Sequence, residues 1–148
     1  MEAHSYQVDV SWIADRKGSL CSPELTAHGG PCVDVATPPE FPKGIPGIWS
    51  PEHLFTAAVS SCLMTTFLAI AEISKLSFTH FSCKSKGILE QIEGKFMMSE
   101  VILEPTVTIS DEKDREKAER ILHKSEAACL ISNSVKSKVT MSPTINIA

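Results

Sequence analysis

Several signals that would place this 148-residue chain in a familiar functional class are missing from its sequence. It has no CxxC pair, no HExxH and no Cys/His cluster with zinc-ligand spacing, so the common zinc motifs are excluded and we expect no metal or cofactor. Lys and Arg number 14 against 18 Asp and Glu, and this net charge of -4 argues against nucleic acid or an anionic membrane as partner. Low-complexity tracts and internal repeats are also absent. The length predicts one domain, over 1–148, with room for a packed core.

An export signal is the next feature that we do not find. The N-terminal stretch MEAHSYQVDVSW has no basic segment followed by an apolar one. The five cysteines are odd in number and irregular in spacing, which does not suggest a disulfide framework. Both observations predict a cytoplasmic protein whose cysteines serve packing or redox chemistry.

What the sequence does contain is a long apolar segment, SPEHLFTAAVSSCLMTTFLAIA, over residues 50–71. Residues 54–71 carry no charge and approach the roughly 20 apolar residues of a membrane span. However, five hydroxyl side chains interrupt the segment, and neither flank has a basic cluster or an aromatic belt. We therefore favour a buried central helix over a membrane span.

The rest of the chain alternates between strand and helix patterns. Alternation of period two, with turn residues between, predicts strands at 5–13, 19–27, 32–36, 78–90, 96–109 and 139–147. Turns are expected at ADRKGSL, where Gly18 is available for positive φ, and at Glu93-Gly94. Residues 37–49, rich in proline, predict an irregular loop of the kind that often binds a ligand.

Two longer helices are predicted. Ser50 as cap and Pro51 at the first helical position begin the central helix, which should end near Lys75. Ser110 should cap a charged helix over DEKDREKAERILHKSEAA, followed by a short helical stretch at CLISNSV. This order predicts an α+β fold with antiparallel sheets packed on a long buried central helix. Because that helix has no polar face, and because Ala57, Ser61 and Thr65 form a row of small residues, we expect a partner subunit to cover it.

Cys62, at the middle of the central helix, is either a packing residue or a reactive one. An apolar setting raises a thiol pKa, and the helix dipole helps little at this position, so reactivity would require a nearby cation. Of the three arginines, Arg115 and Arg120 have acidic partners at i, i+4 spacing, whereas Arg16 has only Asp15 nearby. Arg16 is therefore either an exposed turn residue or that cation, and spacing alone does not decide between them.

Two segments together resemble the osmotically inducible protein C and organic hydroperoxide resistance (OsmC/Ohr) family. SPEHLFTAAVSSCLMTTFLAIAE is similar to that family's N-P-E-x-L-x-A-A-x-A-A-C-F helix, and SEAACLISNSVK to its C-P-I-S-x-x-L/V segment. The order of elements is similar as well, and the chain is nearer the OsmC-like branch. Leu63 stands where the family usually has Phe, and Leu130 where it usually has Pro, which puts the substrate preference in doubt.

The resemblance implies a thiol peroxidase that works as an intertwined homodimer, with the site at the subunit interface. It assigns Cys62 as the peroxidatic and Cys129 as the resolving cysteine, with Arg16, oriented by Glu52, as the activating cation. The reductant would be an external dithiol of the lipoyl type, and the substrate an organic hydroperoxide. Glu52 and Cys62 lie ten residues apart, roughly 15 Å along a helix, so Glu52 either serves the partner's site or supports Arg16 from a distance.

Several further assignments complete the interpretation. The apolar walls of the substrate site are predicted to be Leu54, Phe55, Leu63 and Phe67, whereas Cys21, Cys32 and Cys83 are interpreted as packing residues. Two alternatives stay open: a non-catalytic small-molecule or partner-binding module on the same scaffold, and another thiol chemistry such as persulfide handling. An acidic Cys62 would argue against the first, and turnover of an organic hydroperoxide against the second.

Overall fold

The computed structural model describes residues 1–148, which form two compact units, Met1–Leu54 and Phe55–Ala148. The fold is α+β and contains one long helix, as the sequence predicts. The elements in chain order are β1 Asp9–Ala14, β2 Lys17–Cys21, α1 Pro23–Thr26, β3 Val33–Ala36, α2 Pro51–Ile73, β4 His80–Ile92, β5 Lys95–Ile109, η1 Glu112–Asp114, α3 Arg115–Ala128, η2 Ser132–Ser134, β6 Lys138–Met141 and β7 Thr144–Ile147.

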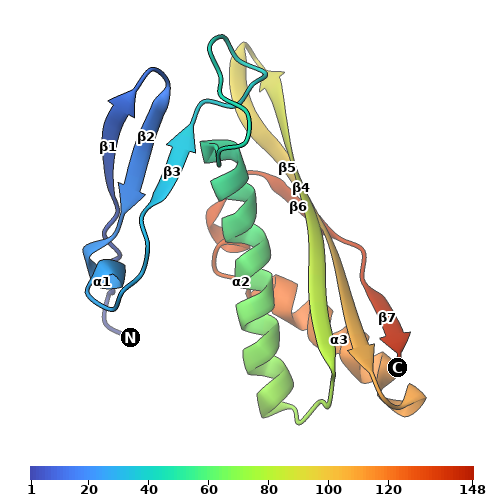
Figure 1. Cartoon of the computed structure of the whole chain (residues 1–148). Coiled ribbons are helices and arrows are strands. Elements are labelled where there is room, and N and C mark those ends of the chain that lie inside the picture. Colours follow the sequence, from blue (N-terminus) through green and yellow to red (C-terminus); the bar gives the residue numbers. More distant parts are fainter. The chain divides into compact units, whose positions relative to one another are not determined.

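The first unit contains an antiparallel sheet in the order β1-β2-β3 (Figure 1). Its first turn consists of Asp15 and Arg16, and the indole N–H of Trp12 donates to the Asp15 carbonyl oxygen at 3.0 Å. The positive φ of this turn belongs to Asp15, at 51°, and not to Gly18 as we predicted. Gly18 instead lies in β2, where a Cβ would come within 2.7 Å of the Ser11 carbonyl oxygen. This glycine is required for close strand approach.

The predicted strand over 19–27 ends early, at Cys21. Pro23 follows at the start of the short helix α1, where its fixed φ suits a helical turn and its missing N–H costs no hydrogen bond. The predicted loop over 37–49 is confirmed, since it contains only an isolated bridge from Trp49 to Val35.

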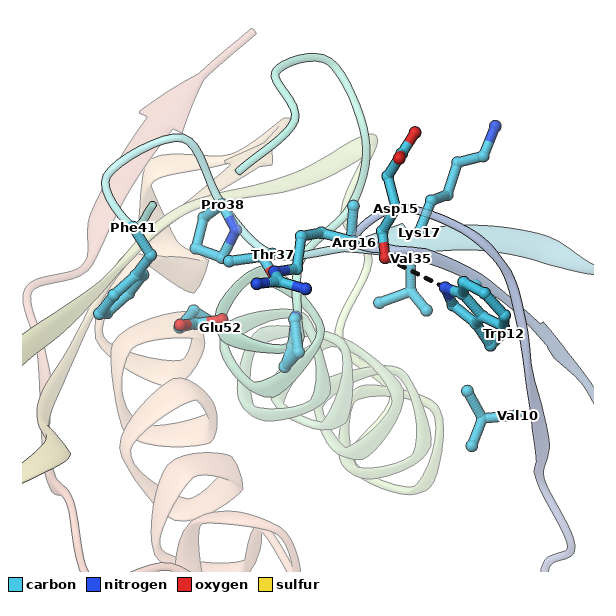
Figure 2. Close-up of a pocket in the computed structure, with 13 residues that line it drawn as sticks. Val10, Trp12, Asp15, Arg16, Lys17, Val35, Thr37, Pro38, Phe41 and Glu52 are labelled. Atoms are coloured by element: carbon cyan, nitrogen blue, oxygen red, sulfur yellow. Dashed lines mark hydrogen bonds between the residues drawn. The ribbon is translucent and has the colours of Figure 1, made fainter. Parts of the chain in front are cut away.

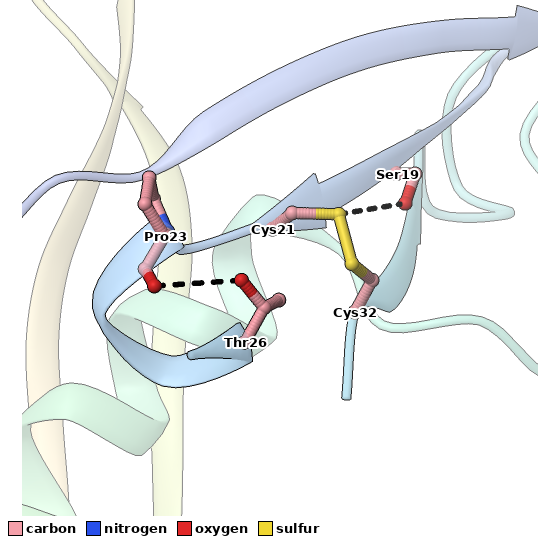
Figure 3. The surroundings of a disulfide bond; sticks show 5 residues. All are labelled: Ser19, Cys21, Pro23, Thr26 and Cys32. Atoms are coloured by element: carbon pink, nitrogen blue, oxygen red, sulfur yellow. Dashed lines mark hydrogen bonds between the residues drawn. A yellow bond between two sulfur atoms is a disulfide. The ribbon is translucent and has the colours of Figure 1, made fainter. Parts of the chain in front are cut away.

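Cys21 and Cys32 form a disulfide, with their Cα atoms 4.5 Å apart (Figure 3). The expectation that both are unpaired packing residues is therefore wrong. The sequence did not reveal the pair because the two cysteines meet only once β2 and β3 are aligned in register. Disulfides are rare in cytosolic proteins. The cysteines therefore no longer support the predicted cytoplasmic location. The location stays a prediction.

Helix α2 begins as predicted. The backbone N–H of His53 donates to Ser50 Oγ at 3.1 Å, and Pro51 is the first helical residue. Its buried residues, Val59, Cys62, Leu63, Phe67 and Ala71, recur every three or four positions and so form one face. In the single chain the helix is therefore buried on one side only, whereas Ser61 and Thr65 of the small-residue row are exposed. The helix is also long and apolar enough to cross a membrane, a property that core helices of soluble proteins share.

The second unit is built on the long hairpin of β4 and β5, whose turn lies at Glu93 and Gly94, as predicted. Both turn residues have positive φ. The predicted closing strand over 139–147 is instead two strands, β6 and β7, broken at Ser142-Pro143. Both pair with β5 in parallel, so this sheet is mixed and not antiparallel throughout.

The start of the second long helix also differs from the prediction. Ser110 is not its cap: the Asp111 carboxylate accepts from the Lys113 N–H at 3.0 Å and begins the turn η1, after which α3 starts at Arg115. The Arg115 guanidinium pairs with Glu112 at 2.6 Å and also donates to the Ile145 carbonyl oxygen at 2.9 Å. Arg115 therefore links α3 to β7. From the sequence we considered only acidic partners of Arg115 at i, i+4 spacing and did not predict this contact.

The core of the second unit lies between α2, α3 and one face of the sheet (Figure 1). Alternate residues of β5 supply that face, and α2 packs along it over two clusters. The first cluster is Phe67, Ala71, Leu76, Val107, Ile109, Ala118, Ile121, Leu122 and Ile145, and the second is Val59, Leu63, Val101 and Leu103. This packing fixes the position of Cys62, which lies on the same buried face of α2.

Candidate active site

Cys62 lies at the middle of α2 with its side chain almost fully buried, at 8% exposure. One turn further along the same helix, Thr66 Oγ1 lies 3.9 Å from the Cys62 sulfur. In an apolar core this placement would leave the thiol protonated and unreactive. The polar groups around Cys62 have the opposite effect.

Four donors surround the Cys62 sulfur. Burial has the largest single effect and raises the pKa of the thiol, but hydrogen bonds from the Cys129 thiol, the Ile131 N–H, the Thr66 hydroxyl and the Leu130 N–H together outweigh it. The pKa of Cys62 is therefore lowered from the ordinary value of 9.0. Hydrogen bonds to a thiolate stabilise the charged form in the same way that they stabilise a carboxylate.

Cys129 has the opposite character. It is fully buried at the end of α3, and burial, its hydrogen bond to Cys62 and the charge of Cys62 all raise its pKa. The hydroxyl and N–H of Ser132 act in the other direction, and that buried hydroxyl has no other hydrogen-bond partner. Both cysteines are free thiols. Of the two thiols, Cys62 is therefore the one that ionises first.

The activating groups differ from those that the sequence led us to expect. We reasoned that Cys62 would need a cation, yet the lowering of its pKa comes from neutral donors, all within the second unit. Two of these donors are backbone N–H groups of the segment after α3, and the other two are the Cys129 thiol and the Thr66 hydroxyl. The role of Thr66 could have been predicted from the sequence, because its hydroxyl follows Cys62 by one helical turn. No feature of the sequence identifies which backbone N–H groups reach the sulfur.

Arg16 and Glu52 line a pocket in the first unit that has a volume of about 520 Å³, within the usual range for small-molecule sites. Its floor follows one row across the sheet, in which Trp12, Gly18 and Val35 are paired neighbours. Gly18 is the central residue of this row. The remaining walls come from Val10, Asp15, Lys17, Ala36, Thr37, Pro38, Phe41 and Pro51.

The charged side chains of this pocket point in different directions. Figure 2 shows the Arg16 guanidinium on the side where the Glu52 carboxylate lies, while the Lys17 side chain extends the other way. The backbone of Arg16 is fixed as well, because its carbonyl oxygen accepts from the Thr37 N–H at 3.3 Å. The structure therefore brings Arg16 and Glu52 to one pocket and brings Cys62 and Cys129 together in the second unit.

The residues predicted as substrate walls are not those of the Arg16 pocket. Leu63 and Phe67 are fully buried in the core of the second unit, and the Phe67 ring stacks on Phe81 with centroids 5.0 Å apart. Phe55 is partly buried against the Leu63 cluster. Neither these residues nor Leu54 line the Arg16 pocket. Sequence reasoning missed the residues that do, Trp12, Pro38 and Phe41 among them.

No group of three or more His, Cys, Asp or Glu side chains is placed to hold a metal ion.

The family of the chain follows from comparison with known proteins. Residues 44–144 match the sequence model of a family described as OsmC-like protein. This match covers more than half of the chain and includes both cysteine segments. The chain belongs to the OsmC-like family.

Other proteins of known sequence or structure are similar to this chain. An uncharacterized protein of Bacillus subtilis, YmaD, is 23% identical over 146 residues, which cover 95% of this chain and 93% of that protein. An OsmC-like protein of unknown function from Vibrio cholerae has a TM-score of 0.83 at 24% identity, covering 95% of this chain and 99% of the other. An organic hydroperoxide resistance protein, OsmC, from Legionella pneumophila has a TM-score of 0.75 at 22% identity, with 99% and 100% covered. At these identities the structures establish the fold, and the names of the relatives do not fix the activity of this member.

Proposed function

We propose that this OsmC-like protein is a thiol peroxidase that reduces organic hydroperoxides to alcohols, with Cys62 as the peroxidatic and Cys129 as the resolving cysteine. The observation that carries the proposal is the pair itself: a thiol with a lowered pKa whose sulfur accepts a hydrogen bond from a second thiol of raised pKa. A protein that uses Cys62 only for packing would not need an acidic thiol. The relatives named for organic hydroperoxide resistance support the same chemistry.

In the first step, the Cys62 thiolate attacks the distal oxygen of the hydroperoxide. The O–O bond breaks, the alkoxide leaves and takes up a proton, and Cys62 becomes a sulfenic acid. Peroxide oxygen is reduced by two electrons, and the Cys62 sulfur is oxidised by two. The N–H groups of Leu130 and Ile131 hold the thiolate in position for this attack.

In the second step, the Cys129 sulfur attacks the sulfenic sulfur of Cys62 and releases water, so that a disulfide forms. The hydrogen bond between the two thiols already places them in contact. An external dithiol then attacks this disulfide, is itself oxidised to a disulfide, and returns both cysteines to thiols. We propose a lipoyl-type dithiol for this role, from the family resemblance.

We further propose that the protein acts as a homodimer and that Arg16 and Glu52 take part in catalysis. The exposed side of α2 supports the homodimer, because a partner subunit could cover this largely uncharged surface. It carries Ser61, Met64, Thr65 and Leu68. The pocket shared by Arg16 and Glu52 supports a role for both in binding or orienting the hydroperoxide. Arg16→Ala should then slow peroxide consumption more than Lys17→Ala does.

Peroxide consumption with cumene hydroperoxide and a dithiol tests the proposal. We expect turnover by the wild type and none by Cys62→Ser, while Cys83→Ser, which removes the other free cysteine, stays active. One equivalent of peroxide should produce a Cys62–Cys129 link in peptide maps, and Cys129→Ser should instead accumulate sulfenic and then sulfinic acid. Absence of turnover with every dithiol tried, together with a Cys62 that alkylates only after unfolding, would leave the non-catalytic binding module as the better explanation.

A further inference from the structure

The Cys21–Cys32 disulfide takes no part in the reaction proposed above. Cys21 is the last residue of β2, and Cys32 immediately precedes β3. In the register of this ladder, in which Leu20 pairs with Val33, the two cysteines are the next opposite positions. Their Cα separation of 4.5 Å is that of directly opposed residues in an antiparallel pair. The disulfide therefore closes one end of the β2–β3 ladder.

The other end of the same ladder carries the Arg16 pocket. Lys17 pairs there with Ala36, and Arg16 and Thr37 are the next residues outward. The Thr37 N–H donates to the Arg16 carbonyl oxygen at 3.3 Å, and the Ala36 N–H donates to the Trp49 carbonyl oxygen at 2.9 Å. Only the short ladder lies between the disulfide and the backbone that positions Arg16.

The two sulfur atoms of this disulfide differ in their surroundings. Cys32 is exposed, whereas Cys21 is half-buried and its sulfur lies 3.8 Å from Ser19 Oγ (Figure 3). A disulfide sulfur carries no proton, so the Ser19 hydroxyl must be the donor in this contact. The same hydroxyl would stabilise negative charge on Cys21. The geometry favours attack on Cys32 with Cys21 as the leaving thiolate.

We propose that the Cys21–Cys32 disulfide is a second thiol–disulfide exchange site, which a dithiol opens, and that its opening loosens the Arg16 pocket. One thiolate of the dithiol attacks Cys32, the S–S bond breaks, and Cys21 leaves as a thiolate that then takes up a proton. The second thiol of the dithiol attacks the mixed disulfide, frees Cys32 as a thiol and becomes oxidised to a disulfide with its partner. The proposal rests on the proposed function only in assuming the same class of reductant.

The exchange step is tested in a variant whose other cysteines, Cys62, Cys83 and Cys129, are replaced by serine, so that failure of the peroxidase reaction cannot affect the result. Dithiothreitol is added to the folded protein, and the appearance of two thiols is followed by alkylation and mass spectrometry. Adding Ser19→Ala should slow opening about fivefold, the value of one modest hydrogen bond. The matched change Ser11→Ala, on the neighbouring strand, should leave the rate unchanged. A disulfide that opens only in denaturant, or a Ser19→Ala rate equal to that of Ser11→Ala, would overturn the exchange mechanism.

The effect on the pocket is tested by amide hydrogen exchange on the same variant, oxidised and reduced. We expect the amides of residues 33–37 to exchange about tenfold faster or more after reduction, because the cross-link no longer restrains the strand pair. Residues 101–109 of β5, in the second unit, serve as the internal control and should not change. A variant with Cys21→Ser and Cys32→Ser should behave as the reduced form does without any reductant. Equal exchange at 33–37 in both redox forms would refute the link between the disulfide and the pocket.

Discussion

Leu130→Pro is a direct test of how Cys62 is activated. The Leu130 N–H is one of the donors that lower the pKa of Cys62, and proline has no N–H to donate. The backbone is suited to the change, because Cys129 has φ −65° and ψ 113°, an extended conformation of the kind preferred before proline. The substitution therefore removes one hydrogen bond from the thiolate, at a position where the preceding residue already has a suitable conformation.

The size of the effect follows from the charge of the acceptor. A hydrogen bond to a charged group contributes about 1.5 kcal/mol or more, which corresponds to about a tenfold change in the ratio of thiolate to thiol. Because only the thiolate reacts, Leu130→Pro should alkylate at Cys62 about tenfold more slowly at pH 6. The midpoint of its rate profile should also move to higher pH, since loss of a donor to the charged form raises the pKa of Cys62.

The assay is alkylation by iodoacetamide from pH 5 to pH 9, with the Cys62 peptide quantified by mass spectrometry. Leu130→Ala is the matched control, since it removes the exposed side chain and keeps the N–H. Circular dichroism and the thermal midpoint establish that both variants fold. If Leu130→Pro and Leu130→Ala react at the same rate, the Leu130 N–H does not stabilise the thiolate, and its role in activating Cys62 is refuted.

Three further predictions concern the assembly and the core. Light scattering at micromolar concentration should give about twice the chain mass of 16.1 kDa, and a stable, active monomer would remove the argument that a partner covers α2. Gly87→Val should destabilise the fold measurably in urea titration, because a Cβ at Gly87 would overlap Thr56 Oγ1, whereas Gly94→Asn, in an open turn, should have little effect. Phe67→Ala should lower the free energy of unfolding by about 3–5 kcal/mol. A normal stability with a raised KM would contradict this and would support Phe67 as a substrate wall.

Much of the fold could be predicted because its signals are local. The cap at Ser50 and the proline after it mark the start of α2, and the Glu93-Gly94 turn marks the hairpin between β4 and β5. Local signals also mislead where two compete within a few residues. Ser110 and Asp111 are both good caps, and the structure uses the second.

Pairing between distant strands could not be predicted in the same way. Alternation indicates that 139–147 is extended. It does not show which strand this segment pairs with, in which direction, or that it forms two strands, β6 and β7, both parallel to β5. The break at Ser142-Pro143 does have a local signal, since proline cannot donate to a ladder, and in the structure that signal outweighs the alternation on either side. The Cys21–Cys32 disulfide depends on register, which a single sequence does not specify.

The candidate site shows the same division between local and distant information. From the sequence, Cys62 is a thiol in an apolar helix, and the physics of that position predicts an inert group unless a cation is near. The groups that reverse this prediction, Cys129 and the N–H groups of Leu130 and Ile131, belong to a segment that meets α2 only in the folded second unit. Backbone donors are present at every residue except proline, so the sequence indicates their presence but not their direction. At position 130, where the family pattern has proline, leucine adds a donor, so the departure that puts the substrate preference in doubt also helps to lower the pKa of Cys62.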